Sequence, residues 1–184
     1  MDVELVVRAQ RGDHQAFASL AVATGDRLHA VALRILRDVE LAEDATQQAL
    51  ITVWRDLPQL RDPDRFEAWS YRLLVRACYV EGRRRRRWGP NLRLLPNDAA
   101  TSSAALSVVA DRDQLERGFR SLSIDHRAVV VLHHYLDLSL EEVAETLSIP
   151  MGTVRSRLHY GMRGLRAALE ADARVDIREA SNER

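Results

Sequence analysis

The chain has 184 residues, enough for one ordinary domain or two small ones with packed cores. Hydrophobic residues make up 46% of it and aromatic residues only 5%, so a mainly aliphatic core is expected. A lone cysteine, Cys78, excludes an intrachain disulfide and cysteine-rich zinc sites, and no apolar run suits a signal peptide or a membrane span. These features predict a cytoplasmic protein without membrane insertion.

Opposite charges cancel over the whole chain but are segregated along it. Residues 1–60 contain nine acidic residues against six arginines, whereas residues 72–93 contain eight arginines and one acid, Glu81. Every basic residue is an arginine, the side chain whose planar fork suits phosphates and guanine edges. Because the charges are segregated, the zero net charge does not exclude a nucleic-acid partner. The exclusive use of arginine is equally consistent with the nucleotide composition of the genome.

The first sixty residues read as core helices. Residues 3–10 form the first, and Asp13 is the expected N-cap of a second that ends near residue 23. After a break at residues 24–26, apolar residues predict a further helix that ends near Arg37. A helix over residues 39–57 follows, with Glu43, Asp44, Gln47 and Gln48 on its outer face, which the pattern alone assigns to solvent.

A loop at residues 58–65 precedes a basic helix that should reach about Gly82. Asp64 and Glu67 are expected to form a capping box at its start. The predicted buried stripe is Phe66, Trp69, Leu73, Ala77 and Val80. The adjacent face carries Arg72, Arg76, Tyr79 and Arg83, and five consecutive arginines occupy residues 83–87. Arginines neutralise phosphates and an aromatic ring stacks on unpaired bases, so this face suits single-stranded DNA; a solvated charged helix is the alternative.

Residues 88–110 read as a linker of changed composition, followed by two helices that begin at Asp111 and Ser123. His133 and His134 are adjacent and face different ways on a helix, with no carboxylate at a suitable offset, so no metal site is expected.

Residues 137–169 predict two short helices across a tight turn. Ser139 and Glu142 form a capping box for the first, and Pro150 ends the turn and starts the second. The second helix has an apolar stripe with arginines around it and no acid between residues 151 and 168. This is the pattern of a helix-turn-helix whose second helix enters the major groove; a helical hairpin with a solvated basic face is the alternative.

The segment Gly152 to His159, GTVRSRLH, carries a resemblance to a known family. It resembles region four of the extracytoplasmic-function (ECF) sigma factors, the domain that reads the promoter −35 element. The segment AEDATQQALITVW, residues 42–54, is similar to region two of the same family, in which an exposed acid and glutamine bind the large subunit of core RNA polymerase. The resemblance implies that Asp44, Gln47 and Gln48 bind the polymerase, although Gln48 stands where glutamate is common.

The same resemblance implies two DNA-binding sets. The residues expected at the −35 element are Thr153, Arg155, Ser156, Arg157 and His159. Of these, Thr153 and Arg157 are expected to contact phosphate, and the other three are expected to contact base edges. Those expected at the −10 element are Arg65, Arg72, Arg76, Tyr79, Arg83 and Arg84. Arg76 and Tyr160 depart from the family wording, so base preference cannot be carried over.

The sequence therefore predicts an all-α fold of two small helical domains joined by a flexible linker. The expected divisions are region two at 1–87, the linker at 88–110, region four at 111–170 and an irregular tail at 171–184. Core RNA polymerase, promoter DNA and an anti-sigma factor are the expected partners, and neither catalysis nor a cofactor is expected, because no phosphate-binding loop or catalytic triad pattern occurs. A stand-alone helix-turn-helix regulator and an interaction protein that binds through its acidic helices are the alternatives.

Overall fold

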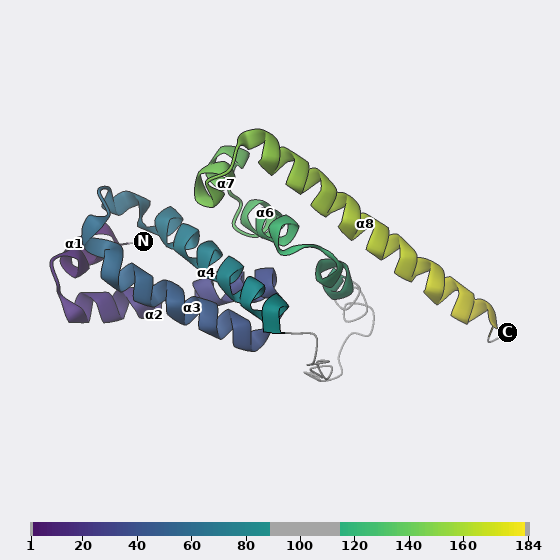
Figure 1. Cartoon of the computed structure of the whole chain (residues 1–184), viewed down its shortest axis with the longest axis horizontal. Helices are drawn as coiled ribbons and strands as arrows, with labels where there is room; N and C mark the ends of the chain where they lie inside the picture. The colour runs from purple at the N-terminus through teal and green to yellow at the C-terminus, as the bar shows by residue number, and fades with distance from the viewer. Residues whose placement is uncertain (1, 89–114, 183–184) are drawn as a thin grey trace.

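A computed structural model describes residues 2–88 and 115–182, with side chains for residues 2–85 and 115–170. Every regular element in these ranges is helical, which confirms the all-α class and the two helical domains (Figure 1). The first domain contains α1 (Val3–Gln10), α2 (His14–Leu36), α3 (Val39–Asp56), the 3-10 turns η1 (Leu57–Gln59) and η2 (Pro63–Arg65), and α4 (Phe66–Trp88). The second contains a helix at 115–121, α6 (Ile124–His134), α7 (Leu140–Leu147) and α8 (Met151–Asn182).

The expected break at residues 24–26 is wrong, because α2 runs through it without interruption. Its buried residues Leu20, Thr24, Leu28 and Val31 follow one stripe at helical spacing. The Thr24 hydroxyl donates to the Leu20 carbonyl oxygen at 2.8 Å, so the threonine is satisfied inside the helix. Burial of this stripe outweighs the cost of about 1 kcal/mol for a glycine within a helix. Asp13 caps α2 as predicted, because its carboxylate accepts from the backbone of Gln15 and Ala16.

The start and the faces of α4 differ from the prediction. Asp64 was expected to cap α4, but the cap in this stretch is Asp62 and it belongs to η2, the turn before α4: the Asp62 carboxylate accepts from the Asp64 backbone N–H. Val80, expected in the buried stripe, is 52% exposed. The helix also continues past Gly82 to Trp88, so the arginine run is helical.

α8 is longer than the sequence suggested. Residues from 171 to Asn182, expected as an irregular tail, continue the helix that begins at Met151, and Figure 1 shows α8 extending away from the rest of the molecule. The linker expected at 88–110 lies outside the described residues, apart from Trp88 at the end of α4.

A large apolar cluster runs through both domains. It joins buried residues of α2, α3 and α4 to Ile124, Leu132, Val143 and Val154 of the second domain. A smaller cluster around Leu20 and Phe66 holds the far end of the first domain, where α1 packs. The second domain therefore lies against α2 and α4, beside which α6 and α7 are drawn in Figure 1.

Candidate nucleic-acid interface

The turn between α7 and α8 is fixed by local hydrogen bonds. The predicted capping box is present: the Glu142 backbone donates to the Ser139 hydroxyl at 3.2 Å, and the Ser139 backbone donates to the Glu142 carboxylate at 2.8 Å. Ser148 ends α7 in the left-handed conformation, at φ 54°. The Pro150 carbonyl oxygen then accepts from the Thr153 backbone at 2.9 Å, which starts α8 after a short turn. This is the predicted helix-turn-helix geometry.

α8 divides into a buried side and an outward side. Val154 and Leu165 are buried against the rest of the second domain. Arg155, Ser156 and His159 are exposed together on the outward side, where base edges would be contacted.

Thr153 and Arg157 lie at the border of that outward face. Both are half-buried, and the Arg157 guanidinium lies 3.4 Å from the Asp125 carboxylate of α6. The Arg157 side chain is 26% exposed, so part of its charge is already engaged within the protein.

Tyr160 and Arg163 extend the outward face beyond the predicted set. Tyr160 is exposed, its ring stacks on His126 with centroids 6.4 Å apart, and the Arg163 guanidinium lies 5.9 Å from its centroid. The sequence contained a signal for this extension, because Ser156, Tyr160 and Arg163 follow one another at intervals of four and three and so lie on one helix face.

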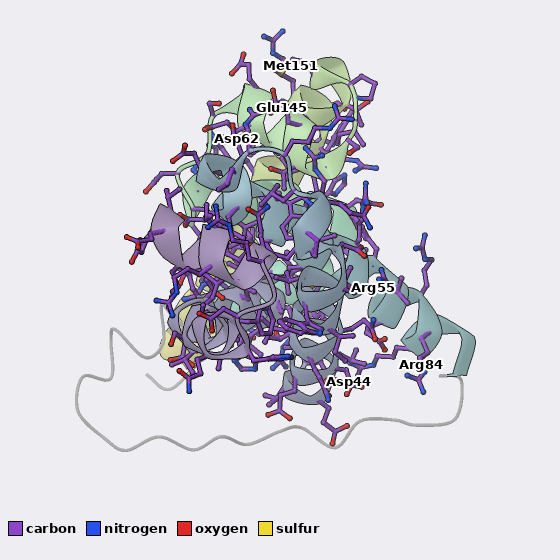
Figure 2. The ribbon with its side chains drawn as sticks, turned by 90° about the vertical axis from the view of Figure 1, so that its left-hand side faces the viewer. Asp44, Arg55, Asp62, Arg84, Glu145 and Met151 are labelled. Atoms are coloured by element: carbon purple, nitrogen blue, oxygen red, sulfur yellow. The ribbon has the colours of Figure 1, made fainter. Side chains whose placement is uncertain are left out.

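The −10 candidates do not form one open surface. Arg76, Arg83 and Arg84 are exposed on α4, and Arg84 projects from the molecule in Figure 2. Arg65 is also exposed, but its guanidinium lies 3.2 Å from the Glu145 carboxylate of α7. Figure 2 accordingly places Asp62, three residues before Arg65, near Glu145.

Arg72 and Tyr79 are more enclosed than their arginine neighbours. Both are half-buried, and the Arg72 Nε and the Tyr79 hydroxyl are shielded from solvent. Burial raises the pKa of Tyr79, the nearby Asp125 carboxylate raises it further, and Arg157 opposes them. A side chain on the first domain therefore lies close to charged groups of the second.

The polymerase-binding candidates lie at the opposite end of the molecule from the helix-turn-helix. Asp44, Gln47 and Gln48 are exposed on α3, while Ala45, between them, and Ala49, directly after them, are buried. Asp44 lies far from Met151, the first residue of α8 (Figure 2). Their exposure on one side of α3 is what the structure contributes to this assignment.

An apolar patch that the sequence reading did not assign continues this face. His14, Phe17, Leu50, Ile51 and Trp54 line an open hollow of about 320 Å³ between α2 and α3. The Trp54 ring lies 4.6 Å from Phe17 and 5.0 Å from His14, centroid to centroid, yet Trp54 remains 37% exposed. Ile51 stands one helical turn after Gln47, so the patch and the polar candidates share one side of α3.

Other kinds of site are missing from the part of the chain that is described. Within residues 2–88 and 115–182, His, Cys, Asp and Glu form no group suited to a metal ion, and no helix is long and apolar enough to cross a membrane. Cys78 is buried in the core, and burial raises the pKa of its thiol to about 12.

Comparison with known proteins decides the family. The sigma-70 region 2 model matches residues 20–88, and the sigma-70 region 4 model matches residues 118–167. The ECF sigma factor SigL of Mycobacterium tuberculosis is 30% identical over 76% of this chain and 80% of its own. The chain belongs to the ECF RNA polymerase sigma factors. SigW of Bacillus subtilis, also an ECF sigma factor, is 28% identical over 89% of this chain and 94% of its own.

The fold agrees with solved sigma factor structures. Sigma factor RpoE of Bartonella quintana, crystallised with the anti-sigma factor NepR, superposes with a TM-score of 0.67 at 21% identity, over 85% of this chain and 98% of that one. Both promoter-reading domains of an ECF sigma factor are thus present, which supports a promoter-directing sigma factor over a stand-alone regulator.

Proposed function

We propose that this sigma factor binds core RNA polymerase through α3, reads the −35 element with the start of α8, and engages the opened −10 strand along α4. The proposed divisions are region two at 1–87, a linker at 88–110, region four at 111–170 and a helical tail. The observation that carries the proposal is the outward face of α8, where Arg155, Ser156 and His159 are exposed beside a short helix-turn-helix turn. A side-chain set of this kind reads base edges in the major groove.

For the polymerase, the proposed contact combines polar and apolar parts. Asp44, Gln47 and Gln48 would hydrogen-bond to the partner, while the hollow beside Trp54 would take an apolar side chain from it. Interfaces of this type draw most of their affinity from a few buried aromatic anchors and their specificity from the polar surround.

On α4, the exposed Arg76, Arg83 and Arg84 are the proposed phosphate contacts. Arg65 and Arg72 would join them once their present surroundings change, because Arg65 is paired with Glu145 and the Arg72 Nε is enclosed. Tyr79 would then stack on an unpaired base. This work takes place in the cytoplasm with the polymerase, and an anti-sigma factor is a proposed regulator, since the similar RpoE of Bartonella quintana was crystallised with one.

The test is run-off transcription with purified core RNA polymerase, with and without the sigma factor, on genomic fragments that include the region upstream of its own gene. New transcripts that start a fixed short distance after a shared pair of motifs are expected, and they define both promoter elements. A Gln47→Ala variant should need more protein to reach the same yield, whereas Gln59→Ala, exposed on η1 in the same domain, should not. Specific duplex binding without any transcript would instead indicate a stand-alone regulator.

A further inference from the structure

The arginine run at the end of α4 does not present all of its charges to solvent equally. Side chains are described for Arg83, Arg84 and Arg85, and the first two are exposed. Arg84 projects from the molecule in Figure 2, and 68% of its side chain is exposed. The corresponding fraction is only 34% for Arg85, the next residue on the same helix. Adjacent arginines therefore differ in how readily their guanidinium groups can reach a phosphate.

The difference arises from Asp38, which lies between α2 and α3. Its Oδ2 accepts a hydrogen bond from Nη1 of Arg85 and forms an ion pair with it. Its Oδ1 accepts from the Leu41 backbone at 3.0 Å, which makes Asp38 the N-cap of α3. One carboxylate thus joins the start of α3 to the end of α4.

Two features make this ion pair firmer than an ordinary surface pair. Only 17% of the Asp38 side chain is exposed, so water screens the pair less than it would in bulk solvent. The cap at Leu41 already fixes the Asp38 side chain, so little further side-chain entropy is lost when Arg85 binds it. Asp38 also offsets part of the repulsion among adjacent like charges at the end of α4.

Glu81 offers Arg84 a much looser contact. Nη1 of Arg84 lies 3.7 Å from Oε2 of Glu81, a separation longer than a hydrogen bond. The Arg84 side chain stays largely in solvent, and exposed pairs of this kind contribute little. A phosphate can therefore take the Arg84 guanidinium, whereas it must compete with Asp38 for that of Arg85.

The number of arginines that reach phosphates sets the sequence-independent part of DNA affinity. Each phosphate that is neutralised releases counterions, so each contact adds affinity and steepens the dependence of binding on salt. Phosphate contacts of this kind position a protein on DNA but do not read its sequence. An arginine that the protein holds back therefore lowers attachment to all DNA alike.

We propose that Asp38 is a positioning residue for the DNA-binding end of α4: it holds Arg85 on the first domain, so that Arg83 and Arg84, and not Arg85, contact the opened strand. The inference rests on the proposed assignment of α4 to the −10 element. Asp38 acts only through Arg85. Its role is to limit how much of the arginine run binds phosphate.

The first test measures the pair without any DNA. Asp38→Asn removes the charge that Arg85 binds but keeps the N-cap of α3, because asparagine caps helices about as well as aspartate. Arg85→Gln removes the other partner. Each single variant should lower the midpoint of urea unfolding, and the double variant should lower it no further, because the second change has no ion pair left to break. Additive shifts would show that the two side chains do not interact, and would overturn the proposal.

The second test titrates the full chain with a fluorescein-labelled oligo(dT) strand at several salt concentrations. Asp38→Asn should bind about fivefold more tightly at about 0.1 M salt, with a salt slope steeper by about 0.7, as expected for one added contact to single-stranded DNA. The double variant Asp38→Asn with Arg85→Gln should return to the wild-type slope. Arg84→Gln should make the slope shallower by about the same amount, because it removes a contact that wild type already makes.

Glu40→Gln is the matched control for the loss of one negative charge. Glu40 is exposed on the first turn of α3, two residues after Asp38, and its replacement should leave the salt slope unchanged. A wild-type slope in Asp38→Asn, or a steeper slope that persists after Arg85→Gln, would show that Asp38 does not act by holding Arg85. Failure of wild type to bind oligo(dT) and to support run-off transcription would refute the proposed function, while the urea result would still report on the ion pair. The two failures are therefore distinguishable.

Discussion

Arg155 and Arg157 lie two residues apart on α8 but in different surroundings. Arg155 is exposed, whereas Arg157 is half-buried and lies 3.4 Å from Asp125. Arg155→Ala should cost about 1–3 kcal/mol of −35 binding and relax preference at one base pair, as expected for a bidentate guanine contact. The measurement is the affinity of wild type and variant for the promoter identified by run-off transcription and for single-base variants of that promoter.

A matched control lies further along the same helix. Arg166 is also exposed, but it follows Arg155 by eleven residues, or about 16 Å of helix. Arg166→Ala should weaken binding to all sequences alike or leave it unchanged. If Arg155→Ala weakens all sequences equally, the residue contacts phosphate, and the proposed division of roles on α8 is wrong.

Trp54 is the aromatic anchor of the patch beside the polymerase-binding candidates. Its ring contacts Phe17 and His14 and is still 37% exposed, so a partner side chain has both a wall to pack on and a hollow to enter. Trp54→Ala should weaken core polymerase binding about tenfold or more, as aromatic hot spots do. Val22→Ala removes a more exposed apolar side chain of α2 outside the patch and should change little. A titration of core polymerase measures both affinities. Equal losses of affinity in Trp54→Ala and Val22→Ala would show that the patch has no specific role in polymerase binding.

The exposure of a single residue was predictable from the sequence where its own helix determines it. The spacing of residues along α3 correctly predicted that Asp44, Gln47 and Gln48 are exposed. The patch around Trp54 was missed because it combines α2 with α3, and no periodicity reports which outward residues of two helices become neighbours. Tyr79 was misjudged for the same reason: its helical position is at a border, and a contact from the second domain decides its burial.

At the scale of elements, the capping box of α7 supports the recognition helix. Ser139 and Glu142 satisfy two backbone N–H groups at the start of α7, which packs on α8. Ser139→Ala should therefore lower the free energy of unfolding by about 1 kcal/mol. Urea unfolding measures the change, with Ser121→Ala as a control because that exposed serine is not an N-cap. Equal stability of wild type and Ser139→Ala would show that the cap contributes nothing.

The same cap predicts a pH dependence. The hydrogen bond from the Ser139 backbone lowers the pKa of Glu142 in the folded protein. Its contribution to stability is therefore present above the unfolded pKa, about 4.3, and is lost as the pH falls through the lower folded value. Glu142→Gln should be less stable than wild type at pH 7, and the difference should shrink toward zero in acid. A difference that stays constant with pH would exclude the charge of Glu142 as its source.

At the scale of the whole molecule, local chemistry predicted the elements and not their assembly. Caps at Asp13, Ser123 and Ser139 were readable because each bonds within a few residues. The continuity of α2 was not predictable in this way, because the glycine and polar residues in its middle resemble a turn. Only the buried stripe that runs through them shows that the helix continues. Packing of α6 on α4 depends on Gly82 meeting Ile124, two residues far apart in sequence whose contact neither neighbourhood encodes.

The shared core makes the domains unfold together. Buried residues of both domains belong to one apolar cluster, so loss of one domain exposes the apolar surface of the other. All three tryptophans, Trp54, Trp69 and Trp88, precede residue 89 and report on the first domain, whereas circular dichroism reports on helices of both. The two signals should give coincident urea transitions in wild type. In Gly82→Leu the new side chain has no room, because even a Cβ atom there would lie 2.8 Å from Cδ1 of Ile124. The variant should therefore uncouple the domains and separate the fluorescence and dichroism midpoints. Separate midpoints already in wild type would mean that the cluster does not couple the two domains.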